Sequence, residues 1–162
     1  MFRQMRRHRQ ALSQEECVSV LHRASSGVLA VLGDEDYPYA VPVSFVFHKD
    51  KIYFHSALEG HKIDAIQRHA KVSFCVIDQD TVVPEKFTTH FRSVIAFGKA
   101  YVVQDAAEKL ESIQALADKY SPGQLRRDEE IQGSLQRMHM VCIAIDRLTG
   151  KQAIELMKKA GE

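Results

Sequence analysis

The fold is decided by residues 53–66, which read Tyr-Phe-His-Ser-Ala-Leu-Glu-Gly-His-Lys-Ile-Asp-Ala-Ile. An aromatic strand ends in this segment, a glycine breaks it, and the apolar spacing beyond predicts a short helix over residues 63–69. Such a junction exposes unpaired backbone N–H groups at the positive end of the helix dipole, where phosphates bind. Polar side chains surround the break: His55, Ser56, His61 and Lys62. The segment therefore predicts a site for a phosphorylated cofactor, although a Gly-His-Lys turn also fits an ordinary solvated loop.

Composition limits the chain to a single domain, residues 1–162, in which 45% of the residues are hydrophobic. The 22 Lys and Arg residues balance 21 Asp and Glu residues, so the chain has no charge bias towards nucleic acid or acidic membranes. No apolar run is long enough for a transmembrane helix or a signal peptide, and we expect a cytoplasmic protein. Three widely separated cysteines form no metal or disulfide pattern and are expected in the core: Cys17, Cys75 and Cys142.

Residues 1–10 form a basic arm with four arginines and a histidine. Blocks of like charge usually mark solvated, mobile tails. The alternative is an arm that folds against its own domain or a partner subunit and lends an arginine to an anionic ligand. No Phe, Tyr or Trp lies between the arginines, so a nucleic-acid partner is not expected.

Turn residues divide the chain into short strands and a few helices. A capping box of Ser13 and Glu16 predicts a first helix, and Gly98 marks a bulge in a long strand. Hairpin-length turns predict antiparallel pairing, and GxGxxG is absent, so a Rossmann fold is excluded. The expected class is mainly β (α+β), a six-stranded antiparallel barrel with flanking helices. Strands are expected at 28–32, 38–47, 52–55, 72–77, 91–103 and 140–145, with later helices at 106–119 and 153–159.

Pro42 gives a second signal, because proline cannot donate to a strand ladder and is confined to sheet edges or bulges. The backbone of Val41, Pro42 and Val43 could therefore face a flat heterocycle such as a flavin ring. An edge strand whose proline prevents aggregation explains the same residues equally well.

Five segments together resemble a known family: Arg6-Arg7, then residues 38–43, 53–64, 91–100 and 145–151. In this order they resemble the pyridoxamine 5′-phosphate oxidase-like flavoproteins, and within them most closely the nitroimidazole-resistance branch. The resemblance covers nearly the whole chain. It implies a split β-barrel that forms a homodimer, with two FMN molecules bound in clefts between the subunits.

The resemblance also implies roles for the junction residues. His61 and Lys62, with Ser56, would hold the FMN phosphate, although relatives often have arginine in place of His61. His55 would lie beside the flavin and donate a proton, since imidazole exchanges protons near neutral pH. A buried barrel histidine is the alternative for His55.

Further contacts are implied around the flavin ring. The backbone of residues 41–43 would face the isoalloxazine, and Ala57 would line the cofactor cleft. Arg92 and Ser93 would approach the ring from the same or the other subunit, where a cation stabilises reduced flavin. Arg92 pairing with a surface carboxylate is an equal alternative.

Two functions remain open on the sequence. In the first, an FMN-dependent oxidoreductase passes electrons from NAD(P)H or another donor to a small nitroaromatic or quinone-like acceptor. In the second, the protein is a flavin-binding carrier, sensor or scavenger without turnover. His55 favours the first, and the lack of a visible NAD(P)H motif favours the second. Metal and serine-hydrolase chemistry are not expected, because no helical HxxxH or HExxH pair and no GxSxG is present.

Overall fold

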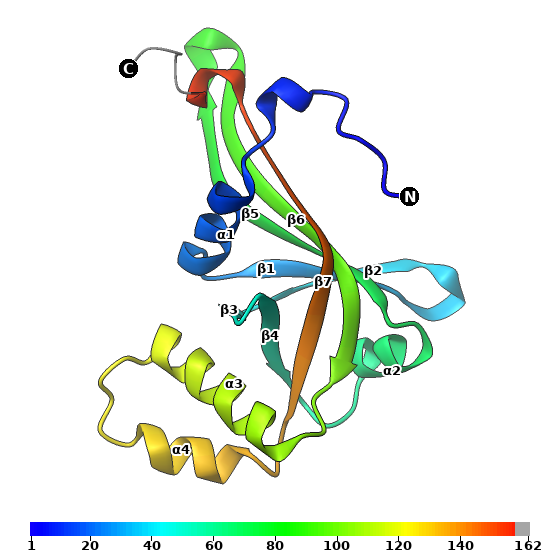
Figure 1. Cartoon of the computed structure of the whole chain (residues 1–162), viewed down its shortest axis with the longest axis vertical. Helices are drawn as coiled ribbons and strands as arrows, with labels where there is room; N and C mark the ends of the chain where they lie inside the picture. Colours follow the sequence, from blue (N-terminus) through cyan, green and yellow to red (C-terminus); the bar gives the residue numbers. More distant parts are fainter. Residues whose placement is uncertain (158–162) are drawn as a thin grey trace.

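The computed structural model describes residues 1–157. Within them, seven strands form one antiparallel sheet in the order β2-β1-β5-β6-β7-β4-β3. The sheet curls into a half-barrel, and β5, β6 and β7 run along most of the molecule's length (Figure 1). The strands are β1 (Gly27–Leu32), β2 (Pro38–Val43), β3 (Val46–His48), β4 (Lys51–Ser56), β5 (Lys71–Val83), β6 (Thr88–Val102) and β7 (His139–Gln152).

The expectation of six strands is wrong, because the segment expected as one strand over 38–47 breaks at Ser44 and Phe45. Phe45 is fully buried, and its backbone bonds to a side chain instead of a strand. The Tyr120 hydroxyl accepts from the Phe45 amide at 2.9 Å and lies 2.9 Å from the Phe45 carbonyl oxygen. The two halves therefore occupy opposite edges of the sheet. The edge position inferred from Pro42 is confirmed, since β2 is an edge strand.

Four α-helices flank the sheet in the described residues: α1 (Gln14–Arg23), α2 (His61–Arg68), α3 (Ala106–Tyr120) and α4 (Arg127–Ser134). The predicted capping box is confirmed at α1, where Ser13 and Glu16 bond each other's backbone amides at 3.1 and 2.8 Å. The helix α4 was not expected, because Ile131 is its one buried residue. The terminal helix expected over 153–159 is wrong where it is described: Ile154–Leu156 is a short 3₁₀ turn, and residues 158–162 lie outside the described residues.

The three long strands exceed their expected lengths. They contain 13, 15 and 14 residues in β5, β6 and β7. The predicted bulge is confirmed: the register of β6 on β7 shifts between Phe97 and Gly98. A Cβ atom on Gly98 would lie 2.2 Å from the Ala144 carbonyl oxygen, so glycine permits the close approach.

Two apolar clusters lie on the two faces of β4. Ile52 and Phe54 join the larger cluster, which α1 and α2 cover, whereas Tyr53 joins a smaller cluster beneath α3 and α4. This alternation is the ordinary period of two of a strand. Cys17 and Cys142 are buried as expected, and Cys75 is half-buried.

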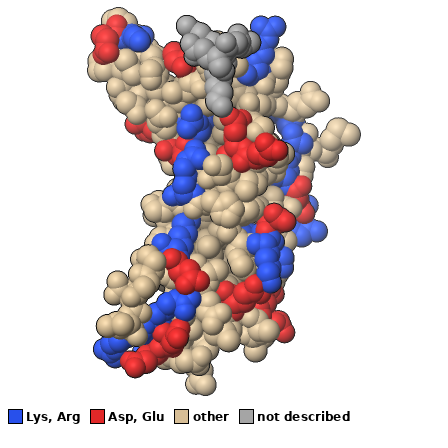
Figure 2. Space-filling view, turned by 60° about the vertical axis from the view of Figure 1, so that its left-hand side comes forward, with Lys and Arg blue, Asp and Glu red and all other residues tan. Residues whose placement is uncertain are grey.

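The N-terminal arm, residues 1–10, is mostly exposed and contacts the sheet at Phe2, and the residues just after it pair with β7. The Phe2 ring packs on Phe97 at 5.4 Å between centroids, and Leu12 donates a backbone hydrogen bond to Gly150 at 2.9 Å. Acidic and basic side chains intermix over the face drawn in Figure 2. None of the described helices is long and apolar enough to cross a membrane.

Candidate functional site at the β4–α2 junction

The junction between β4 and α2 depends on Gly60, whose φ of +128° suits glycine alone. Nothing lies within 4 Å of the position of a Cβ atom there, so conformation and not space requires the glycine. Its carbonyl oxygen accepts from the amides of Ile63 and Asp64 at 2.9 and 3.1 Å. The amides of His61 and Lys62 precede these and have no acceptor within the helix. The junction therefore presents backbone donors at the start of an eight-residue helix.

Two side chains add to these donors. Ser56 is 3% exposed, and its Oγ has no hydrogen-bond partner within residues 1–157. Burying a hydroxyl without a partner is unfavourable, so this atom is suited to a ligand oxygen. Lys62 is half-exposed, and its ammonium pairs with no carboxylate in the described chain. The hydroxyl, the ammonium and the two amides are each donors of the kind that an oxyanion such as phosphate accepts from.

His61 is held by the β1–β2 turn. Its ring stacks on Tyr39 with 4.1 Å between centroids, and its Nε2 accepts from the Asp34 amide at 3.3 Å. The Asp34 carboxylate pairs with Arg68 at 2.8 Å, and this contact lowers the pKa of Asp34. A Cβ atom on Gly33 would lie 2.9 Å from Nε2, so glycine makes room for the ring. With Nε2 engaged, Nδ1 is the ring atom left to donate to a phosphate.

His55 lies on the other face of β4 from Ser56, as strand alternation requires. Its exposed side chain lines a cavity of about 1010 Å³ between β4, α3 and α4. Ser44, at the break between β2 and β3, lines the same cavity. The rest of the lining combines apolar side chains with the charged residues Arg126, Arg127 and Glu130. The apolar side chains include Ile113, Leu116, Ala117, Ile131 and Met138.

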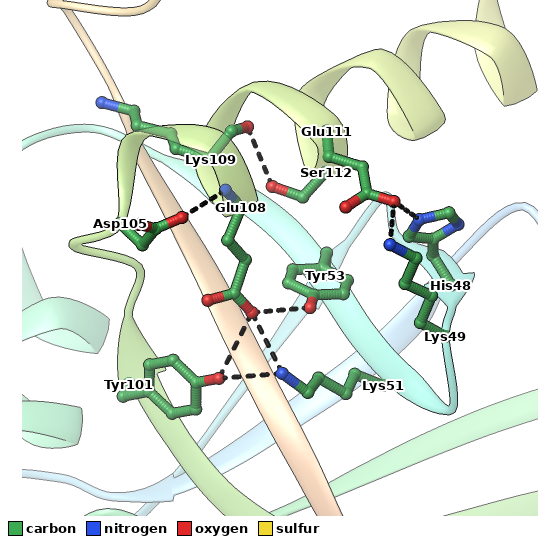
Figure 3. A network of polar contacts seen from close by, with 10 residues as sticks. All are labelled: His48, Lys49, Lys51, Tyr53, Tyr101, Asp105, Glu108, Lys109, Glu111 and Ser112. Atoms are coloured by element: carbon green, nitrogen blue, oxygen red, sulfur yellow. Dashed lines mark hydrogen bonds and ion pairs between the residues drawn. The ribbon is translucent and has the colours of Figure 1, made fainter.

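A polar network anchors α3 to the sheet beside this cavity (Figure 3). The Glu108 carboxylate accepts from Tyr53 at 2.7 Å, from Lys51 at 3.1 Å and from Tyr101 at 3.4 Å. The bond to Tyr53 contributes most to lowering the pKa of Glu108, and the bond to Glu108 raises the pKa of Lys51 to about 12. Burial, followed by the bond to Glu108, raises the pKa of Tyr53. The network fixes one wall of the cavity relative to β4.

Arg92 pairs with a carboxylate, the alternative that the sequence left open. Its Nη1 donates to Asp78 at 3.1 Å and its Nε to Gln152 at 3.2 Å. Arg23 also donates twice to Asp78, at 2.7 and 2.6 Å. Ser93 lies beside this group, opposite Ile77 on β5. These contacts join β5, β6, β7 and α1. None of them reaches the β4–α2 junction, so they do not bring Arg92 and Ser93 to that site within one chain.

The other ring contacts implied by resemblance lie at the sheet edge and after β4. Val41 and Val43 are half-buried against the larger apolar cluster, and Pro42 between them is exposed. The outer side of β2 has no strand partner among the described residues. Ala57 is exposed directly after Ser56.

Sequence reasoning missed the contribution of α4 to the cavity. Arg127 and Ile131 on α4, and Met138 in the segment after it, line the cavity, yet none carried a recognisable motif. The available signal was the acidic run of residues 128–130, which favours the first turn of a helix. No group of three His, Cys, Asp or Glu side chains within residues 1–157 is arranged to hold a metal ion.

A curled antiparallel half-barrel of seven strands with flanking helices is the architecture expected of a split-barrel protein. The chain belongs to the pyridoxamine 5′-phosphate oxidase family, whose model matches residues 13–152. The family resemblance predicted from sequence is thereby confirmed. No curated protein matches the chain.

Solved structures share the fold. A conserved hypothetical protein of Mycobacterium tuberculosis is 18% identical with a TM-score of 0.81, covering 98% of this chain and 99% of that one. A candidate 5-nitroimidazole antibiotic resistance protein of Bacteroides thetaiotaomicron is 22% identical with a TM-score of 0.74, covering 88% and 86%. An FAD-binding protein of Mesorhizobium loti is 25% identical with a TM-score of 0.65, covering 88% and 96%.

Proposed function

We propose that this protein binds FMN through its phosphate at the β4–α2 junction and is an oxidoreductase. The observation that carries the proposal is the Ser56 Oγ at the end of β4, which is buried and has no partner among residues 1–157. Four residues later Gly60 begins the turn into α2, whose first amides, those of His61 and Lys62, are open. The Lys62 ammonium supplies the charge that a phosphate dianion requires. The ligand group proposed for these donors is a single phosphate, so we take the mononucleotide FMN rather than FAD as the cofactor.

The flavin ring then lies in a cleft of a homodimer. The backbone of Val41, Pro42 and Val43 lies on an open sheet edge and is suited to pair with the polar rim of the isoalloxazine. Ala57 adjoins the same cleft. Arg92 and Ser93 contact the ring from the second copy, since their contacts within one chain are with β5, β7 and α1.

The proposed reaction is reduction of a small nitroaromatic or quinone-like acceptor, with NAD(P)H as the donor. When bound, FMN supplies hydride chemistry. A quinone becomes a hydroquinone by gaining one hydride and one proton. His55, exposed on the cavity wall, donates that proton from its imidazole.

A flavin-binding carrier without turnover is the second candidate. One observation favours it: His55 and Ser56 project from opposite faces of β4, so the proton donor and the phosphate cradle are separated within one chain.

Visible absorption tests the proposal first. The purified protein, before and after addition of FMN or FAD and desalting, should retain oxidised-flavin bands with FMN. Anaerobic NADH or NADPH should bleach these bands, and menadione should restore them. Replacement of His55 by alanine should slow recolouring, whereas the matched change at exposed His69 should not. A protein that retains no flavin overturns the proposal, and one that retains flavin without bleaching is the carrier.

A further inference from the structure

The cavity between α3 and α4 has the size and lining of a ligand site. Its volume of about 1010 Å³ lies at the upper end of the range for small-molecule pockets, and its apolar wall includes Ile113, Leu116 and Met138. Leu125, in the loop between the two helices, also lines the cavity while its side chain is fully exposed. An exposed leucine beside an apolar cavity gains burial when a ligand fills the space.

The contacts of Arg127 bear on the charge and hydrogen-bonding groups of a ligand that fits this cavity. Its Nη2 donates to Asp118 at 2.6 Å and to the Gln114 carbonyl at 3.2 Å, and its Nη1 donates to Asp128 at 2.9 Å. Its Nε is buried without a hydrogen-bond partner in the described chain. The guanidinium therefore has its charge compensated by two carboxylates and keeps one N–H unused. Such a group favours a neutral oxygen acceptor over an anion.

The charge around the cavity supports the same choice. Arg126 and Glu130 both line the wall beside Arg127, but Arg126 already pairs with Glu129 at 3.1 Å. Glu130 is therefore the charge that a ligand carboxylate would meet, and it would repel it. Apolar side chains from α3 and α4 line the space, and Ser44, at the break between β2 and β3, and His55 on β4 add polar groups. These features fit a planar ring with a polar edge.

We propose that the α3–α4 cavity binds an uncharged, planar aromatic molecule whose oxygen accepts a hydrogen bond from Arg127 Nε. The proposal rests on the proposed function in one respect: the molecule bound in this cavity is taken to be the electron acceptor of the proposed reaction. Binding itself requires no flavin. Quinones and nitroaromatics both carry such an oxygen on a planar ring.

Methionine methyl groups provide the measurement. Met138 lines the α3–α4 cavity, whereas Met5 lines a separate cavity beside β7. The full chain, labelled with ¹³C at its methionine methyls, is titrated with menadione in the flavin-free and FMN-loaded forms. The Met138 signal, assigned through Met138→Leu, should shift to saturation while the Met5 signal stays in place.

Three comparisons test the contacts. Ala117→Phe places a ring inside the cavity and should abolish the titration. Arg127→Met removes the unused N–H and should weaken menadione binding by about tenfold. Arg137→Met is the matched control, because Arg137 does not line the cavity and its Nε already donates to the Gly133 carbonyl at 2.7 Å, and it should leave binding unchanged. Naphthoquinone sulfonate, the anionic analogue, should bind more weakly than menadione.

The outcomes separate this proposal from the flavin assignment. An absent Met138 shift, or equal menadione affinity in the wild type, Ala117→Phe and Arg127→Met, overturns it. It is also overturned if FMN alone shifts Met138 and blocks menadione, since the cavity then holds the flavin. A saturable Met138 shift in a protein that retains no FMN supports the cavity site while the proposed function fails. An unperturbed Met5 signal in each variant shows that the variant is folded.

Discussion

The Tyr53 hydroxyl donates a 2.7 Å hydrogen bond to the Glu108 carboxylate, and so joins the middle of β4 to the first turn of α3 (Figure 3). Tyr53 is 3% exposed. The same strand carries His55, and the same helix forms one wall of the α3–α4 cavity. The pair therefore sets the position of the cavity relative to His55.

Removal of either partner should destabilise the protein, and by unequal amounts. Tyr53→Phe removes one charge-assisted hydrogen bond, so the free energy of unfolding should fall by about 1.5 kcal/mol. Glu108→Ala also leaves the Tyr53 hydroxyl buried without its acceptor, so the loss should reach about 3 kcal/mol. Urea unfolding followed by far-UV circular dichroism measures both.

Glu111, one turn further along α3, is the matched control. Its carboxylate contacts His48 at 2.8 Å and Lys49, but the side chain is 43% exposed. Exposed ion pairs contribute little, so Glu111→Ala should destabilise much less than Glu108→Ala. Equal losses at the two positions would show that the buried network does not hold α3.

Gly33→Ala should disturb the β1–β2 turn at His61. The new Cβ atom would lie 2.9 Å from His61 Nε2, from the Tyr37 carbonyl oxygen and from Tyr39 Cβ. Overpacking of this kind should lower the free energy of unfolding by about 1–3 kcal/mol. The His61 imidazole resonances, measured by NMR, should also move as the ring leaves Tyr39.

Gly133→Ala is the control, because the nearest atom to its Cβ position is Arg137 Nη2 at an ordinary 3.5 Å. Gly133 lies within α4, where alanine should stabilise the helix by about 0.5–1 kcal/mol. A Gly33→Ala variant as stable as the wild type would contradict the packing at His61.

Features with a local cause were predictable from sequence. The capping box at Ser13, the bulge at Gly98 and the strand-to-helix change around Gly60 each depend on residues close together in the chain. Pro42 located a sheet edge because the missing N–H is a property of the residue itself.

Features that depend on distant partners were not predictable. The break at Phe45 requires the hydroxyl of Tyr120, 75 residues away in sequence. The pairing of Arg92 requires Asp78, which sits next to a register shift in β5. The α3–α4 cavity requires α4, whose single buried residue, Ile131, gives no helical periodicity.

Asp78 should make stability depend on pH in the acid range. Hydrogen bonds from Arg23, and then from Arg92, lower its pKa below the ordinary value of 3.8. A carboxyl with a lowered pKa stabilises the folded state above the unfolded pKa, and this contribution is lost as the pH falls through the folded value. The free energy of unfolding, measured between pH 6 and 2.5, should therefore differ between wild type and Asp78→Asn above pH 4. The difference should shrink below pH 4.

Asp80 is the control for this pH dependence, because it is exposed on the same strand. Asp80→Asn makes the same change of charge without removing a buried ion pair, so its pH profile should run parallel to that of the wild type. A constant difference between wild type and Asp78→Asn across the whole range would mean that Asp78 acts through packing alone.

Lys62→Ala should weaken FMN binding by about 10- to 100-fold, because it removes a charge-assisted contact to the phosphate. The reference variant is Lys71→Ala at the exposed start of β5, which should bind FMN as the wild type does. Titration followed by flavin absorbance measures both. Equal FMN affinities for the two variants would show that the phosphate does not bind at the β4–α2 junction.

Ser56→Ala separates the phosphate contact from a structural role. Its buried hydroxyl has no partner in the described residues, so alanine should leave the flavin-free protein as stable as the wild type, or slightly more stable. FMN affinity should nevertheless fall by about 5- to 10-fold, because the ligand oxygen loses its donor. Urea unfolding of the flavin-free form and FMN titration measure the two effects independently. A variant that loses stability while keeping its FMN affinity would show that the Ser56 hydroxyl has a structural role. The phosphate would then be bound by the amides and Lys62 without Ser56.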